Sequence, residues 1–163
     1  MLLSLSCSTL LAIGFAGCGT AKPKVSIPSK SEADSSQSVP KREPDRITVQ
    51  HCLIGFKGSV GDKPITRTEE EAKELATKLL AELKAGANFD EVIRTHTDDS
   101  PPGIYKMANK GIAVDSASGE MGRGQMVRAF GDTGFPLEVG QYGLAEYDVD
   151  KSPFGWHIVK RIE

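Results

Sequence analysis

Residues 46–54 read Arg-Ile-Thr-Val-Gln-His-Cys-Leu-Ile, and residues 155–159, close to the other end of the chain, read Gly-Trp-His-Ile-Val. In the first stretch every second residue falls on one side, the two-residue period of a β-strand: Ile47, Val49, His51 and Leu53. The second stretch predicts another strand over 154–162. Each strand therefore carries one histidine among apolar neighbours.

A polar ring in a strand interior is costly unless it has a partner. One such histidine would be interpreted as a hydrogen-bonded core residue. Two histidines in matching strands favour a shared role, because His51 and His157 meet if the first and last strands pair at the centre of one sheet. Asp99, at the start of a long loop, is the natural acidic neighbour.

Two helices are predicted between these strands. Residues 68–71, Thr-Glu-Glu-Glu, have the form of a capping box, and Gly86 stands where a helix ends. Between them the apolar residues recur at helical spacing: Ala72, Leu75, Ala76, Leu79, Leu80 and Leu83. Asn88 repeats the cap pattern before a shorter helix that ends near Thr97.

The rest of the chain is less regular. Residues 98–118 contain Pro101-Pro102 and few periodic apolar positions, so we expect a long loop there. A short helix is expected over 126–134, and a further strand over 142–148.

The first seventeen residues contain no charged side chain and hold an apolar run over 10–16, which is too short to span a bilayer and suits a secretory signal. The run ends in Phe-Ala-Gly-Cys at 15–18, which resembles the lipobox of bacterial lipoproteins. That resemblance implies cleavage before Cys18 and acylation of this residue, and places the protein in the cell envelope, anchored outside the cytoplasm by lipid. The sequence departs from the pattern in having no Lys or Arg before the run. A cleaved signal without lipid is the alternative.

Residues 18–45 predict a flexible tether, because they are rich in Ser, Lys and Pro and nearly devoid of large apolar side chains. Residues 19–44 carry a net charge of +2, which leaves −4 for the rest of the chain. This balance offers no field that would collect nucleic acid. With Cys7 and Cys18 assigned to the N-terminal segment, Cys52 has no intramolecular disulfide partner. We expect residues 46–163 to form one domain, and the protein to be a monomer.

Seven short blocks of this domain resemble, in order, those of the parvulins, a family of peptidyl-prolyl cis/trans isomerases. The blocks are 51–54, 66–72, 88–92, 97–100, 119–122, 123–130 and 155–159. The resemblance implies an α+β, FKBP-like fold of βαααββ order, with a four-stranded, mostly antiparallel sheet and three to four helices. It also implies that the domain binds proline-containing polypeptide segments and isomerises their X-Pro bonds.

Carried over by position, the resemblance makes His51 and His157 the paired histidines of the catalytic centre. Asp99 stands where parvulins carry Cys or Asp. Three apolar residues match the positions that hold the substrate proline ring: Met121, Met126 and Phe130. Taken alone, Met126 and Phe130 would be interpreted as core or gap-filling residues.

With Asp99 in place of a cysteine, we expect non-covalent catalysis without a cofactor. A metal site built from the histidines, Cys52 and Asp99 is disfavoured, because adjacent strand residues such as His51 and Cys52 point to opposite faces. The loop after the first strand holds only Lys57 and Lys63, with Arg67 beyond, so we expect no preference for phosphorylated substrates.

The expected function is isomerisation of X-Pro bonds in unfolded or exported proteins. Two alternatives stay open at this point. One is a parvulin-shaped module that holds peptides without catalysis, and the other is an envelope lipoprotein whose domain only docks a partner.

Overall fold

A computed structural model describes residues 42–163. The predicted signal, Cys18 and most of the predicted tether lie outside the described residues.

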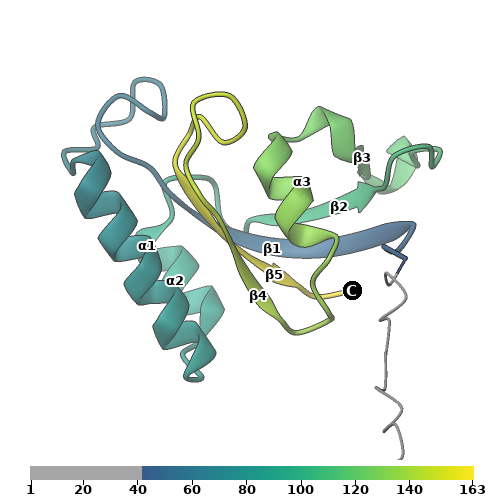
Figure 1. The fold of residues 1–163 in the computed structure, drawn as a ribbon, viewed down its shortest axis with the longest axis horizontal. Helices are drawn as coiled ribbons and strands as arrows, with labels where there is room; N and C mark the ends of the chain where they lie inside the picture. Colours follow the sequence, from purple (N-terminus) through teal and green to yellow (C-terminus); the bar gives the residue numbers. More distant parts are fainter. Residues whose placement is uncertain (1–41) are drawn as a thin grey trace, which may run out of the picture. The chain divides into compact units, whose positions relative to one another are not determined.

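β1 (Arg46–Ile54) is the central strand of a five-stranded sheet, flanked on both sides by antiparallel neighbours (Figure 1). One neighbour is β2 (Ile104–Ala108), which pairs in parallel with the two-residue strand β3 (Met121–Gly122). The other neighbour is β5 (Trp156–Arg161), which pairs antiparallel with β4 (Tyr142–Ala145). The strand order is β3-β2-β1-β5-β4.

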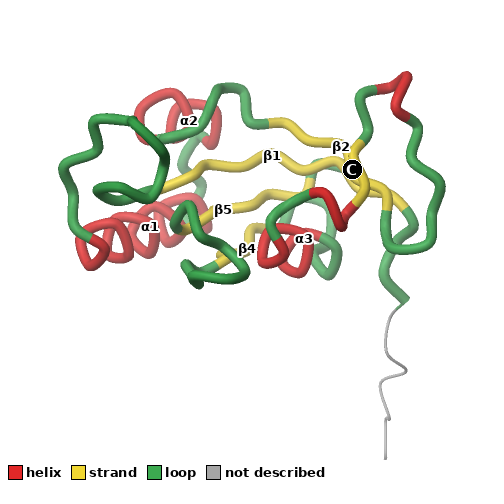
Figure 2. The backbone as a smooth tube through the Cα atoms, turned by 90° about the horizontal axis from the view of Figure 1, so that it is seen from above, coloured by secondary structure: helices red, strands yellow, loops and turns green. Residues whose placement is uncertain are grey.

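Helices α1 (Glu69–Lys84) and α2 (Phe89–His96) lie on one face of this sheet, and α3 (Arg128–Gly134) lies on the opposite face (Figures 1 and 2). Two short 3-10 turns, η1 (Ser116–Ser118) and η2 (Arg123–Gln125), lie between β2 and α3. Within residues 42–163, no helix has both the length and the apolar character needed to cross a membrane.

The alternation along β1 explains why the sheet has a core on each face. Ile47 and Val49 pack with Phe130 and Phe135 beneath α3, whereas Cys52 and Ile54 pack with α1 and α2. Because β1 is covered on both faces, all of its side chains after Arg46 are buried.

The capping box predicted for α1 is confirmed. The Thr68 hydroxyl accepts a hydrogen bond from the Glu71 amide at 3.2 Å, and the Glu71 carboxylate accepts one from the Thr68 amide at 2.8 Å. The helix ends at Lys84 with Ala85 as its C-cap, and Gly86 follows with a φ of +105°.

The α+β class, the mostly antiparallel sheet and the central pairing of the first and last strands are confirmed. The sheet has five strands and not the four that the resemblance implies. Residues 98–118 are also not one loop, because they contain β2. The proline pair followed by Gly103 signals a turn, and in β2 itself only Met107 and Ala108 are buried. A two-residue strand such as β3 has too little pattern to be predicted. The expected helix over 126–134 begins two residues later, at Arg128.

The residues just before β1 contact the domain. Arg123 binds the carboxylates of Glu43 and Asp132, at 2.6 and 2.8 Å. The side-chain amide of Asn109 donates a hydrogen bond to the Pro44 carbonyl at 2.9 Å. Glu43 and Pro44, which the sequence assigns to the tether, are therefore held against η2 and the end of β2.

Gly103 offers a test of how β1 is held at its histidine. It has a φ of +67°, its carbonyl accepts a hydrogen bond from the His51 amide at 2.9 Å, and a Cβ atom here would lie 2.4 Å from the His51 carbonyl oxygen. We expect Gly103→Ala to lower the free energy of unfolding by the cost of a left-handed alanine, about 1–2 kcal/mol, plus about 1–3 kcal/mol for the displaced strand.

The matched control is Gly111→Ala, where φ is +79° and no atom lies within 4 Å of the added Cβ. Only the conformational cost applies there. Urea unfolding of both variants measures the difference, and equal losses in stability would contradict this packing of Gly103 against His51.

Candidate active site

The pairing of β1 with β5 places the two strand histidines together. His157 lies opposite Leu53 and Val159 lies opposite His51, so the two histidines are diagonal neighbours on the same face of the sheet. Their Nδ1 atoms are 3.2 Å apart, and their rings are within 16° of parallel. Both are almost fully buried, with exposed fractions of 3% for His51 and 4% for His157.

Asp99 is brought to the histidines by the loop that follows α2. The Leu53 amide donates to the Thr97 hydroxyl, the Asp98 amide donates to the Leu53 carbonyl, and the Gly55 amide donates to the Asp98 carboxylate. These bonds tie the loop to the end of β1 and leave the Asp99 Oδ2 atom 3.0 Å from His51 Nε2.

The hydrogen bond from His51, followed by those from the Ser100 amide and the Tyr105 hydroxyl, holds the pKa of the Asp99 carboxyl well below its usual value, against the opposing effect of burial. Asp99 is therefore an anion. As an anion it can only accept, so His51 Nε2 carries a proton and donates it to Asp99. When both imidazoles are neutral, His51 Nδ1 is bare and accepts a hydrogen bond from His157 Nδ1.

This arrangement leaves His157 Nε2 as a bare, buried atom without a hydrogen-bond partner among the described residues. Burial, together with the neighbouring His51, lowers the pKa of His157 to about 3. The site thus holds one carboxylate and two imidazoles, linked in the order Asp99, His51, His157.

A cavity of about 320 Å³ opens above this chain of hydrogen bonds, between β1, β2, α3 and the loops at their ends. Most of its lining is apolar or aromatic. The three hydrogen-bonded residues, Asp99, His51 and His157, also line it. The lining residues are His51, Leu53, Val60, Asp99, Tyr105, Gln125, Met126, Val127, Phe130, Phe154 and His157.

Of the three residues expected to hold a proline ring, the structure brings Met126 and Phe130 to this cavity but not Met121. Met121 lies in β3, where it pairs with Met107, and lines a different hollow on the surface. The segment around Met121 was matched to a family block by its glycines. In the structure this segment forms β3, and β2 lies between it and β1. The side chain from β2 that lines the cavity is Tyr105.

A family model described as the PPIC-type PPIASE domain matches residues 36–163. The chain belongs to this family, the parvulin-type peptidyl-prolyl isomerases.

Two relatives are named as peptidyl-prolyl cis-trans isomerases. The chain is 34% identical over 125 residues to dodo of Drosophila melanogaster, named as a peptidyl-prolyl cis-trans isomerase; the match covers 72% of this chain and 66% of that protein. It is 30% identical over 127 residues to peptidyl-prolyl cis-trans isomerase Pin1 of Arabidopsis thaliana, covering 72% of this chain and 95% of that protein. The solved structure of peptidyl-prolyl isomerase ESS1 from Candida albicans shares the fold, with a TM-score of 0.50 and 23% identity over 75% of this chain and 65% of that one.

Cys52 takes no part in the parvulin site. Its side chain packs under α1 and α2, on the face of the sheet opposite to His51, and is fully buried. Burial raises the pKa of its thiol to about 12. It therefore offers neither a thiolate nucleophile nor a ligand to the histidines. Trp156 packs on the same face as Cys52, as the alternation along β5 predicts.

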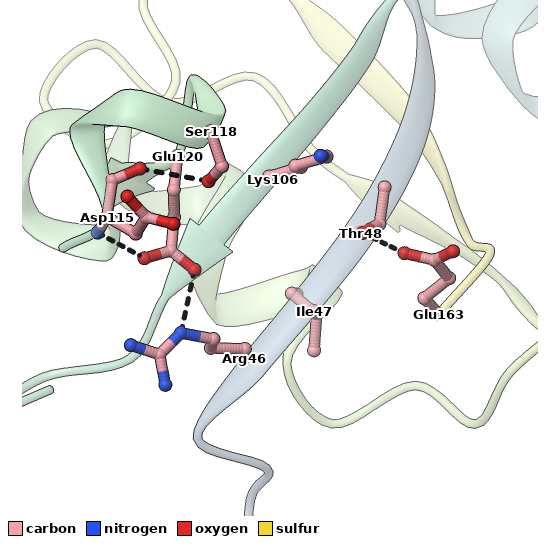
Figure 3. A pocket seen from close by; sticks show the side chains of 8 residues that line it. All are labelled: Arg46, Ile47, Thr48, Lys106, Asp115, Ser118, Glu120 and Glu163. Carbon is pink, nitrogen blue, oxygen red and sulfur yellow. Dashed lines mark hydrogen bonds and ion pairs between the residues drawn. The ribbon is translucent and has the colours of Figure 1, made fainter.

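A second hollow of the parvulin domain lies at the Arg46 end of β1 (Figure 3). Its volume is about 280 Å³, and its walls are mostly charged or polar. Arg46 Nε lies 3.0 Å from the buried Glu120 carboxylate, and the Thr48 hydroxyl donates to Glu163 at 2.6 Å. These groups largely satisfy one another, and the hollow lacks the apolar lining that a proline ring requires.

Sequence reasoning missed several residues of the cavity. Leu53 could have been found, because it is two residues from His51 on the same face of a predicted strand. Tyr105 was hidden within the expected loop. Val60 and Phe154 come from two loops whose approach no local pattern indicates; the Ser59 hydroxyl joins these loops by donating a hydrogen bond to the Phe154 carbonyl.

The neutral His157 predicts a pH dependence of stability. Its pKa is about 3 in the folded protein, against an ordinary value of 6.5. As pH falls below 6.5, the unfolded chain binds a proton here that the folded protein does not, so stability present at neutral pH is lost between about pH 6.5 and 3. We expect His157→Gln to flatten the curve by up to about 1.4 kcal/mol per pH unit between pH 6 and 4.

Urea unfolding at pH steps between 7 and 4 measures this difference. Asp99 does not interfere, since its contribution is lost only as pH falls below its ordinary pKa of 3.8. Parallel curves for the two proteins would show that His157 is protonated as easily in the folded as in the unfolded chain.

Proposed function

We propose that this parvulin domain isomerises X-Pro bonds in exposed, extended segments of unfolded or exported proteins, by a non-covalent mechanism and without selection for phosphate. The observation that carries the proposal is the chain Asp99–His51–His157 at the base of an apolar cavity walled by Met126 and Phe130. The apolar cavity is suited to a pyrrolidine ring. The polar groups at its base are suited to the change of charge on the substrate carbonyl during rotation.

The reaction requires rotation about an amide bond, whose barrier is about 18–20 kcal/mol. No bond has to break. In the twisted transition state the conjugation is lost, so the carbonyl oxygen loses negative charge and the nitrogen lone pair becomes localised. A site helps if it binds this twisted state more tightly than either planar isomer. The cavity grips the ring, and the Asp99–histidine chain sets the field around the carbonyl as one coupled unit.

The absence of a usable thiol supports a non-covalent route within the described part of the chain. Asp99 occupies the position at which a cysteine would stand. Cys52 lies on the opposite face of the sheet with a raised pKa.

The charges around the cavity support unphosphorylated substrates. None of its lining residues is Lys or Arg, and Asp99 is an anion. Of the cations on or just after the loop that follows β1, Arg67 pairs with the Asp98 carboxylate and the Lys63 ammonium donates to the Asp98 carbonyl. A phosphate before the proline would meet repulsion without a compensating cation.

We expect the wild-type protein to accelerate exchange between the cis and trans forms of Ala-Pro and Leu-Pro peptides. A His51→Ala, His157→Ala double variant should return the exchange to its spontaneous rate, because both imidazoles of the coupled unit are removed. Two-dimensional exchange NMR measures both rates.

The control is His96→Ala, which removes the remaining histidine, at the end of α2 and outside the cavity. It should leave the rate unchanged. Equal rates for the wild type and the double variant would refute the proposed site. Binding without faster exchange in the wild type would instead favour the alternative, a peptide-holding module. Faster exchange of phosphoserine-Pro than of Ser-Pro peptides would overturn the claim about phosphate.

We further propose that the protein is a lipoprotein of the cell envelope, anchored through Cys18 and acting as a monomer. The support is the sequence of residues 1–18 and the polar stretch that follows it. Two acyl chains on one residue suffice for stable anchoring.

Expression of the full chain in bacteria tests the anchor. The wild type should incorporate labelled fatty acid and sediment with membranes, whereas Cys18→Ala should do neither. Cys52→Ala, which alters the buried cysteine, is the matched control and should behave as the wild type. Label on the Cys18→Ala protein would contradict the assignment.

A further inference from the structure

Tyr105 is the one residue of β2 that lines the cavity, and neither the motif pattern nor the predicted site included it. Its ring meets those of His51 and Phe130 edge-on, with centroids 5.2 and 5.9 Å apart. The ring thus forms part of the wall, and its orientation is fixed by aromatic neighbours on β1 and α3.

The hydroxyl of Tyr105 donates a hydrogen bond to Asp99 Oδ2 at 3.0 Å. The same oxygen accepts from His51 Nε2 at 3.0 Å. The Asp99 carboxylate is therefore held between donors on two adjacent strands, although a third of its side chain is exposed. Burial and the neighbouring carboxylate raise the pKa of Tyr105, so the hydroxyl keeps its proton.

The position of this carboxylate matters because the histidine pair has two neutral arrangements. The two Nδ1 atoms face each other, and only one of them can carry the shared proton. In the first arrangement His51 is protonated at Nε2 and His157 at Nδ1. In the second arrangement both protons move, so that His51 Nε2 is bare and His157 Nε2 is protonated. Only the first can donate to Asp99.

We propose that Tyr105 is a positioning residue of this site: its hydroxyl fixes the Asp99 carboxylate against His51 Nε2 and so selects one tautomer for both imidazoles. Without the hydroxyl, the part-exposed carboxylate keeps only the donors from His51 and the Ser100 amide, water competes for it, and the second arrangement becomes accessible. His157 Nε2, at the base of the cavity, then changes from a hydrogen-bond acceptor to a donor. The effect of Tyr105 on catalysis rests on the proposed isomerase function. Its effect on the histidine tautomers does not.

The test is Tyr105→Phe in the full chain, because phenylalanine keeps the ring and removes only the hydroxyl. In the wild type, ¹⁵N NMR of the imidazoles should show His157 protonated at Nδ1 and bare at Nε2. In the variant it should show a mixture of both tautomers. In peptide exchange kcat should fall roughly ten-fold, the scale of one hydrogen bond to a charged group, with KM little changed because the wall is intact.

Tyr142→Phe is the matched control, since Tyr142 lies on β4 and packs against Phe89 away from the cavity. It should leave the tautomers and the exchange rate unchanged. Adding Tyr105→Phe to Asp99→Ala should cause no further loss, because the hydroxyl acts through the carboxylate.

Unchanged His157 tautomers in Tyr105→Phe would overturn the inference, whatever the exchange rate. A further loss of kcat on the Asp99→Ala background would also overturn it, by showing that the hydroxyl acts on the substrate directly. If the wild type failed to accelerate exchange, the proposed function would fall, and the NMR comparison would still decide the role of Tyr105.

Discussion

The site depends on the antiparallel register between β1 and β5. With Leu53 opposite His157, the two histidines are diagonal neighbours on the face covered by α3. A slip of one residue would turn His157 towards α1 and α2, into an apolar core without a partner for it. Two strands far apart in the sequence must therefore pair in one exact register before the two histidines can meet.

The rest of the structure offsets the cost of burying the two histidines. Two buried imidazoles are costly. The cost is limited because His51 is hydrogen-bonded both to Asp99 and to His157. Thr97 and Asp98 tie the Asp99 loop to the end of β1, and Tyr105 holds the carboxylate from the other side. One atom, His157 Nε2, stays without a partner among the described residues, beneath a cavity able to receive a substrate.

How far the sequence predicts the molecule follows from the range of each interaction. The strand over 46–54 and the helix behind Thr68 were predictable, because alternation and capping are local properties. The meeting of His51, His157 and Asp99 was predictable only by joining two strand patterns to the order of the family's blocks. Met121 was expected at the cavity but lines another hollow, because the strand next to β1 is β2 and not the segment around Met121. Tyr105 was missed because the prolines and the glycine ahead of β2 signal a loop. The pairing of β2 with β1 is a tertiary contact, which no local pattern reveals.

The central claim is that a proline ring enters the cavity above the two histidines. Intermolecular nuclear Overhauser effects between the wild-type protein and a saturating Ala-Leu-Pro-Ala peptide test it most directly. The account predicts contacts from the proline ring protons to the Met126 methyl group and the Phe130 ring. Contacts instead to Ile47 in the polar hollow at the far end of β1, or none to the cavity at saturation, would contradict it.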